Sequence, residues 1–171
     1  GPVGLATMAY GQGIAVNMVQ QVRAISAFGN GGKLMQPKLV KALTDSDGNV
    51  VKEYESKIIR QVVSEQTASE ICEMMEAVVS EGGGGNAKIP GFRVGGKTGT
   101  ANKPSPTGGY SNETYSSFIG MAPMDDPKVT ILFVADNPKG VKYGSTTAAP
   151  YAKIALENIL RYLGVEPQYT P

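Results

Sequence analysis

Apolar residues recur at helical spacing in three stretches of the chain. The first covers residues 18–28, where Asn17 is suited to cap the N-terminus and a run of glycines follows. The second runs from its N-cap Ser64 to about residue 80, and the third covers residues 150–163, with proline in its first turn. We therefore expect three amphipathic helices.

Each predicted helix has one apolar face that should be buried. The face of the second helix consists of Ala68, Ile71, Cys72, Met75, Val78 and Val79. The face of the third consists of Tyr151, Ala155, Ile159 and Tyr162, widened by Ala152, Leu156 and Leu163.

The second helix is followed by four consecutive glycines, residues 82–85, which predict a mobile loop.

Two β-prone runs, residues 34–40 and 50–54, flank a turn-forming segment at 45–49. Asp47-Gly48 between two such runs is a strong signal for a β-hairpin. The acidic residues also suggest a calcium-binding loop, but the glycine comes too early for that pattern. We therefore interpret the segment as a hairpin.

Three further β-prone runs, residues 93–101, 114–122 and 128–135, follow one another with short links. This order predicts an antiparallel three-strand meander covered by helices, which is an α+β fold. Residues 129–134 are apolar on both faces of the strand, which predicts a central strand that is covered on two sides.

The links between these strands are polar. Residues 102–112 contain prolines and a glycine pair, and we expect a loop there. Asp125 and Asp126 form an adjacent pair of carboxylates, but they stand in a short turn between two prolines. We interpret them as solvated turn residues and not as an acid–base pair.

Composition limits the class of protein. The chain has 171 residues, of which 41% are hydrophobic and 18% charged, and its formal net charge is +1. These values are typical of one soluble globular domain, and they give no electrostatic reason to expect nucleic acid as a partner. No apolar run approaches the roughly 20 residues that cross a bilayer, so we expect any membrane anchor to lie outside this sequence.

Two absences narrow the chemistry further. The chain has no histidine, which excludes Ser-His-Asp and Cys-His catalysis within it. With Cys72 as the only cysteine, we expect neither a zinc site nor an internal disulfide, and no cofactor. Cys72 lies on the apolar face of its helix, so we interpret it as a buried structural thiol.

The strongest candidate for chemistry is the segment 94–101, which contains Lys97, Thr98, Gly99 and Thr100. One ammonium group, two hydroxyls and several glycines can bring a carboxylate or phosphate close to main-chain N–H groups. One interpretation is a phosphate-binding loop, since residues 91–98 match G-x-x-x-x-G-K-[ST]. Such a loop needs a strand before it and a helix after it, and neither flank has that pattern. We therefore favour the K-T-G element of serine enzymes that react with penicillin, in which the lysine stands on a strand.

The order of several motifs resembles the C-terminal half of the transpeptidase domain of class B penicillin-binding proteins. The motifs, in chain order, are Tyr10-Gly11-Gln12-Gly13, Asn30-Gly31-Gly32, Pro37, Lys97-Thr98-Gly99-Thr100, Ser117-Phe118-Ile119-Gly120, Tyr143-Gly144 and Ala149-Pro150. The resemblance covers nearly the whole chain. Local departures are Asn17-Met18 and Gly144-Ser145, where the family usually has Thr-Pro and Gly-Gly.

The resemblance also shows what the sequence lacks. No serine is followed three residues later by lysine, and none begins S-x-N. In the family S-x-x-K supplies the nucleophile and its base, S-x-N completes the cleft, and both precede the Gly-Gln-Gly segment. We therefore expect residues 1–164 to be the C-terminal half of the domain, inactive alone, and residues 165–171 to begin a linker.

The resemblance implies a role for each residue of the K-T-G strand. Lys97 would supply positive potential, and the Thr98 and Thr100 hydroxyls would bind the substrate carboxylate. The Thr100 N–H would be one donor of the oxyanion hole, and Gly99 would leave the strand bare for a peptide. We interpret residues 11–13 as structural.

The expected partners follow from the same family. They are the D-Ala-D-Ala stem peptide of peptidoglycan, β-lactams and the missing half of the domain, at the extracytoplasmic face of the bacterial membrane. Because the missing half would leave apolar surface uncovered, we also expect self-association. A second hypothesis is a non-catalytic module that binds cell-wall peptide or a partner protein.

Overall fold

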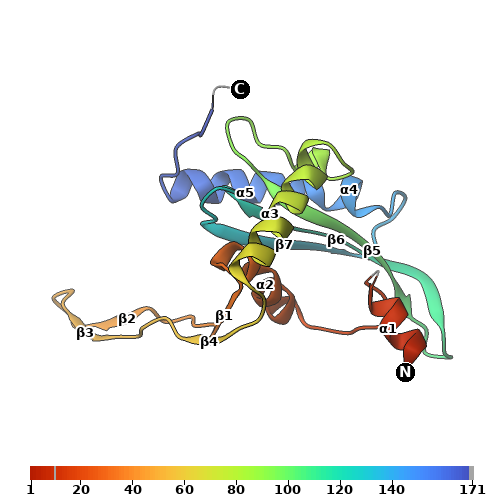
Figure 1. Ribbon diagram of the computed structural model, residues 1–171, viewed down its shortest axis with the longest axis horizontal. Coiled ribbons are helices and arrows are strands. Elements are labelled where there is room, and N and C mark those ends of the chain that lie inside the picture. The colour runs from red at the N-terminus through yellow and green to blue at the C-terminus, as the bar shows by residue number, and fades with distance from the viewer. Residues whose placement is uncertain (10, 170–171) are drawn as a thin grey trace.

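The fold is centred on a three-stranded antiparallel sheet (Figure 1). The structure is a computed structural model that describes residues 1–9 and 11–169. The strands are β5 (Gly95–Pro104), β6 (Tyr110–Ala122) and β7 (Val129–Asp136), in the order β5-β6-β7. The predicted meander is confirmed, and so is the α+β class.

Two details of the sheet differ from the prediction. Residues 102–112 are not one loop, because β5 and β6 continue pairing through Asn102 opposite Thr114 and leave only 105–109 as the turn. β7 is an edge strand and not the central one. Its apolar residues on both faces are explained by helices that pack on either side of it, which leave most of them half-buried.

Helices cover both faces of the sheet. α5 (Ala149–Tyr162) packs on one face, where Phe118 and Leu156 belong to one buried cluster. α2 (Met18–Ser26) and α3 (Glu65–Ser80) pack on the other, around a cluster that contains Met75 and Met121. The short helical segments are α1 (Pro2–Ala9), η1 (Phe28–Asn30), η2 (Gly85–Ala87) and α4 (Gly144–Thr147).

The predicted starts of α2 and α3 are confirmed by their caps, whereas α5 starts without a side-chain cap and has Pro150 in its first turn. Asn17 and Gln20 form a reciprocal capping box at α2, and the Ser64 hydroxyl accepts from the Thr67 N–H at α3. Cys72 on α3 is half-buried, and it packs against the methionine cluster. Burial raises the pKa of the Cys72 thiol.

The predicted apolar face of α5 is confirmed for Ala152 and Leu156, which are buried, and wrong for the tyrosines. Tyr151 and Tyr162 are exposed, and the buried residues are Ala149, Ala152, Leu156 and Leu160. The small alanines let the helix approach the sheet closely, whereas the Tyr151 ring stacks on Phe133 at 5.4 Å between centroids. The buried face of α5 therefore consists of alanines and leucines, while Tyr151 contacts β7 through its exposed ring.

A long two-stranded arm extends from the body between α2 and α3 (Figure 1). β1 (Lys33–Met35) pairs with β4 (Ile58–Gln61), and β2 (Ala42–Thr44) pairs with β3 (Val50–Glu53). The hairpin at Asp47-Gly48 is confirmed, with Gly48 at φ 86°. The predicted first strand, 34–40, is wrong over most of its length, because the chain pairs at 33–35, runs irregularly and pairs again at 42–44.

The ends of the chain hold two features that the hydrophobic pattern did not predict. Helix α1 has no buried residue, although Val3 and Leu5 are apolar. Near the C-terminus, Gln168 Nε2 bonds Asp125, the Gln168 N–H donates to Gly91 O, and the Tyr169 hydroxyl donates to Phe92 O. Among the described residues, no helix is long and apolar enough to cross a membrane.

Candidate functional site

The four predicted site residues lie together at one edge of the sheet. Lys97, Thr98, Gly99 and Thr100 are consecutive on β5, which pairs with β6 on one side only. Gly95 and Gly96 before them are buried, whereas the four residues themselves are exposed or half-buried. The strand therefore leaves the core and reaches the surface at Lys97.

Alternation along the strand divides the four residues between its two faces. Lys97 and Gly99 lie on one face, and Thr98 and Thr100 lie on the other. The Lys97 ammonium donates to the Thr98 carbonyl at 2.9 Å. It forms no ion pair with a carboxylate in the part of the chain that the structure describes, so its charge is not neutralised there.

Two neighbouring cations, Arg93 and Lys103, do form ion pairs with carboxylates. Arg93 makes a two-point contact with Glu76, with donor–acceptor distances of 2.8 and 2.6 Å, and this hydrogen bonding raises the pKa of Arg93. Lys103 bridges to Asp136, which raises the pKa of Lys103. Both cations connect neighbouring elements of the fold, whereas Lys97 remains available to an anion.

The Thr100 side chain is held by a hydrogen bond from Gly144, the first residue of α4. The buried Gly144 N–H donates to Thr100 Oγ1 at 3.2 Å. Because this bond occupies the oxygen as an acceptor, the hydroxyl hydrogen of Thr100 is free to donate elsewhere. A Cβ on Gly144 would lie 2.3 Å from Ser117 O and 2.4 Å from Gly99 O, so only glycine allows α4 to approach the sheet this closely.

Two further hydrogen bonds hold residues 142–145, which include the start of α4, in place beside the K-T-G strand. Ser116, which is fully buried on β6, donates to the Lys142 carbonyl, and Asn86 Nδ2 donates to Ser145 O at 2.8 Å. Sequence reasoning named Tyr143-Gly144 as a motif and Gly144-Ser145 as a local departure, but it did not predict this support. The tight Gly144 approach is a tertiary feature with no periodic signal along the chain.

The glycines of the segment have different roles. A Cβ on Gly96 would lie 2.3 Å from Phe118 Cζ, and one on Gly95 would lie 2.5 Å from Met124 Sδ. These two glycines therefore serve packing inside the protein. A Cβ on Gly99 would lie 2.5 Å from Ser117 Oγ, and Ser117 is half-buried.

The phosphate-loop interpretation is contradicted by the structure. Residues 95–104 form a single strand, so no helix begins after Lys97 and Thr98. A phosphate loop needs the N–H groups and the dipole of such a helix. Among residues 1–9 and 11–169, there is also no cluster of three Cys, Asp or Glu side chains that could hold a metal ion.

Comparisons with known proteins agree with the motif order. Residues 3–157 match the family model described as the penicillin binding protein transpeptidase domain. The chain is 44% identical to stage V sporulation protein D of Bacillus subtilis, over 98% of the chain and 26% of that protein. It is 32% identical to the peptidoglycan D,D-transpeptidase FtsI of Escherichia coli, over 95% of the chain and 26% of that protein.

Solved structures give the same result for the fold. Penicillin-binding protein 3 of Mycobacterium tuberculosis, complexed with ampicillin, superposes with a TM-score of 0.84 at 30% identity, covering 97% of this chain and 39% of that one. The transpeptidase domain of penicillin-binding protein 3 from Burkholderia pseudomallei has a TM-score of 0.81 at 35% identity, covering 98% and 48%. The chain spans about a quarter of the length of the curated relatives described above. From its motif order, its fold and these matches, the chain belongs to the penicillin-binding protein transpeptidase domain family.

Proposed function

We propose that this segment supplies one wall of the active site of a peptidoglycan D,D-transpeptidase that works through an acyl-serine intermediate. The observation that supports this most directly is the Lys97 ammonium at the open edge of β5, which forms no ion pair among the residues that the structure describes and has Thr98 and Thr100 close to it in the strand. A cation and two hydroxyl donors beside free main-chain groups suit a ligand that has both a carboxylate and a reactive carbonyl.

In this proposal each residue of the strand has one task. Lys97 supplies positive potential at the ligand carboxylate and the reacting serine, and the Thr98 and Thr100 hydroxyls bind the carboxylate. The Thr100 N–H donates to the developing oxyanion. The Thr98 carbonyl accepts from Lys97 at the strand edge, and backbone groups two residues apart turn to the same edge, which favours that orientation of the Thr100 N–H.

The nucleophile and its base must come from another segment of the protein, because no S-x-x-K or S-x-N occurs in this chain. We propose that residues 1–164 form the C-terminal half of the domain and are inactive alone. Residues 165–171 would begin a linker, the first part of which, up to Tyr169, packs against the domain.

The proposed ligands are the D-Ala-D-Ala end of a stem peptide and β-lactams. Support comes from relatives named as peptidoglycan D,D-transpeptidases and from similar structures complexed with ampicillin and aztreonam. We place the site at the extracytoplasmic face of the bacterial membrane, where peptidoglycan is cross-linked.

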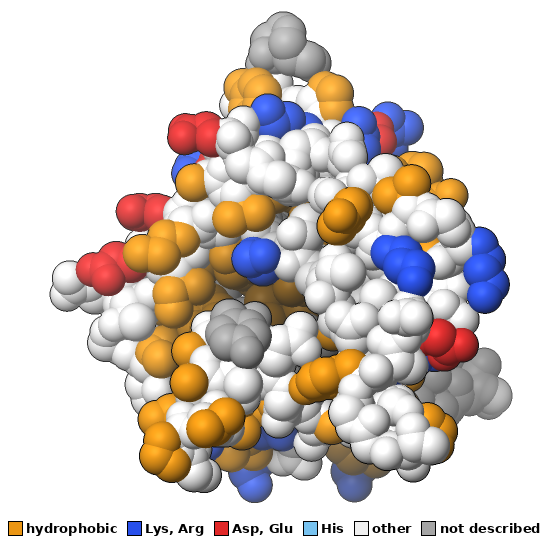
Figure 2. Space-filling view, turned by 90° about the vertical axis from the view of Figure 1, so that its right-hand side faces the viewer, with side chains coloured by type: hydrophobic (Ala, Val, Ile, Leu, Met, Phe, Trp, Pro, Cys, Tyr) orange, Lys and Arg blue, Asp and Glu red, His pale blue; other side chains and the backbone are white. Residues whose placement is uncertain are grey.

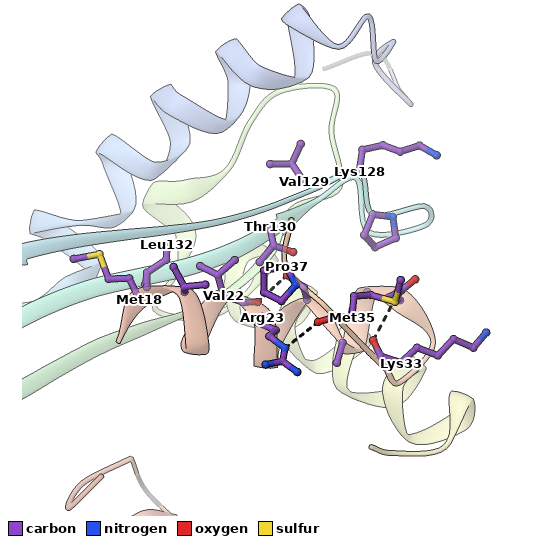
Figure 3. Close-up of a pocket in the computed structure, with 16 residues that line it drawn as sticks. Met18, Val22, Arg23, Lys33, Met35, Pro37, Lys128, Val129, Thr130 and Leu132 are labelled. Atoms are coloured by element: carbon purple, nitrogen blue, oxygen red, sulfur yellow. Dashed lines mark hydrogen bonds between the residues drawn. The ribbon is translucent and has the colours of Figure 1, made fainter. Parts of the chain in front are cut away.

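A groove beside β7 supports the need for a second segment. It lies between α2 and β7 and has a volume of about 550 Å³. Figure 3 shows Met18 and Val22 of α2 opposite Leu132 of β7, with Arg23 Nε donating to Met35 O at 2.9 Å nearby. We propose that the other half of the domain covers this apolar groove and the open edge of β7.

A second uncovered region lies near α1. Figure 2 shows hydrophobic side chains gathered around a hollow on the face that contains this helix. The exposed fraction of Val3 is 77% and that of Leu5 is 74%. Apolar surface of this kind is typical of an interface, and it favours self-association of the isolated chain.

The test of the catalytic role is Lys97→Ala in the full-length protein that carries this segment. We expect the second-order rate of acylation by a β-lactam to fall about 100-fold or more, as with loss of other groups that stabilise transition-state charge. The rate is measured by intact mass after timed incubation.

Lys41→Ala is the matched control, since it removes an exposed lysine on the arm and should leave the rate unchanged. Acylation of Lys97→Ala at the unmodified rate would refute the role of Lys97. If the full-length protein is not acylated at all, the hypothesis of a non-catalytic binding module is favoured.

A further inference from the structure

Ser117 on β6 stands directly opposite Gly99 of the K-T-G strand. Opposed residues of antiparallel strands project to the same face, and alternation places Lys97 on that face as well. A Cβ on Gly99 would lie 2.5 Å from Ser117 Oγ. The hydroxyl therefore occupies the space in which any other residue at position 99 would carry its side chain.

The Ser117 hydroxyl is free to bind a ligand. Ser117 is half-buried, and its Oγ has no hydrogen-bond partner among residues 1–9 and 11–169. The adjacent Ser116 is a useful comparison, because its fully buried hydroxyl donates to the Lys142 carbonyl on the opposite face of the sheet. Of these two neighbouring hydroxyls, one holds the fold together and the other is available at the surface.

The backbone beneath Ser117 is held firmly. Gly144 approaches the Ser117 carbonyl from the other face so closely that a Cβ there would lie 2.3 Å away. The same glycine donates its N–H to Thr100 Oγ1. Ser117, Gly99 and Thr100 are therefore fixed relative to one another, as a binding site requires.

We propose that the Ser117 hydroxyl is a further ligand-binding group of the site. It donates to an oxygen acceptor, either a carboxylate or a carbonyl, of a peptide-like ligand that lies over Gly99 beside Lys97. This inference rests on the proposed function and adds one residue to the same site. It also gives Gly99 a specific task, which is to leave room for this hydroxyl.

The first experiment is Ser117→Ala in the full-length protein. We expect β-lactam acylation to slow about tenfold, the loss of one hydrogen bond to a charged or strongly polar group. Ser69→Ala is the control, because Ser69 is exposed on α3 and lies outside both the K-T-G strand and the α2–β7 groove, and it should acylate at the unmodified rate. An unmodified rate for Ser117→Ala would overturn the proposal.

A second experiment separates binding from packing. Gly99→Ala should lower both the melting temperature and the acylation rate, because its Cβ collides with Ser117 Oγ. Adding Ser117→Gly removes the collision, so the melting temperature should recover while acylation stays slow. If acylation recovers fully as well, the hydroxyl contributes nothing to the ligand and the proposal fails.

The two proposals can fail separately. If Lys97→Ala loses acylation and Ser117→Ala does not, only the role of Ser117 is refuted. If Ser117→Ala does slow acylation, the same comparison with a β-lactam and with its methyl ester identifies the acceptor. A larger loss of acylation rate with the free carboxylate than with the ester indicates that Ser117 binds the carboxylate. Equal losses of rate with both compounds indicate a carbonyl.

Discussion

At the scale of single residues, the glycines around Lys97 are explained by packing more than by ligand access. Gly96 faces the ring of Phe118 across the strand pair, and Gly99 faces the Ser117 hydroxyl. A glycine-rich segment beside a lysine therefore has two functions in one strand. The buried end closes the core, and the exposed end makes room for polar groups.

Gly96→Ala should destabilise the protein by about 1–3 kcal/mol, because its Cβ would lie 2.3 Å from Phe118 Cζ and 2.6 Å from Ile119 O. Urea unfolding of the full-length protein measures the change. Gly83→Ala is the control, since a Cβ there meets nothing within 4 Å. Equal stability of the two variants would contradict the packing role of Gly96.

At the scale of elements, α3 positions the K-T-G strand. The helix packs against β5, and Glu76 on it holds Arg93 just before the strand begins. The start of α3 depends on Ser64, whose hydroxyl accepts from the Thr67 N–H at 3.1 Å. A local cap therefore contributes to the placement of the candidate site.

Ser64→Ala should lower the free energy of unfolding by about 1 kcal/mol, the usual contribution of an N-cap. Ser80→Ala at the other end of the helix keeps the cap, and we expect a change within about 0.5 kcal/mol. Thermal and urea unfolding of both variants provide the comparison. A loss at Ser80 as large as that at Ser64 would mean that the cap is not the cause.

At the scale of the whole molecule, the open edge of β7 and the groove beside it are the exposed surfaces that most favour association with other chains. β7 has eight residues and an open outer edge, and the groove beside it is lined by Val19, which is 62% exposed. Long apolar edges promote pairing with other chains unless they are covered. The isolated chain should therefore self-associate.

Val19→Glu should reduce self-association of the isolated chain, because it places a charge in the groove. Sedimentation velocity over a range of concentrations measures the effect. Val141→Glu makes the same change at a residue that is 52% exposed and outside the groove, and it should leave association unchanged. A monomeric unmodified chain would contradict the expectation.

The sequence by itself determined the helix starts, the hairpin turn and the position of the K-T-G strand. Each of these depends on neighbours in the chain: a cap and the N–H group three residues away, an Asp-Gly pair, or a tripeptide in a glycine-rich, β-prone run. The order of these motifs also identified the family, because spacing along the chain is a property of sequence alone.

The tertiary structure decided which side of α5 is buried, which strand lies at the edge, and what surrounds Thr100. The buried residues of α5 are two alanines and two leucines, and the tyrosines stay exposed, because close helix–sheet packing depends on the space that the partner leaves. Likewise, the contacts of Gly144 and Ser117 with the K-T-G strand join positions 44 and 18 residues apart. Such contacts have no local pattern, so only the folded chain reveals them.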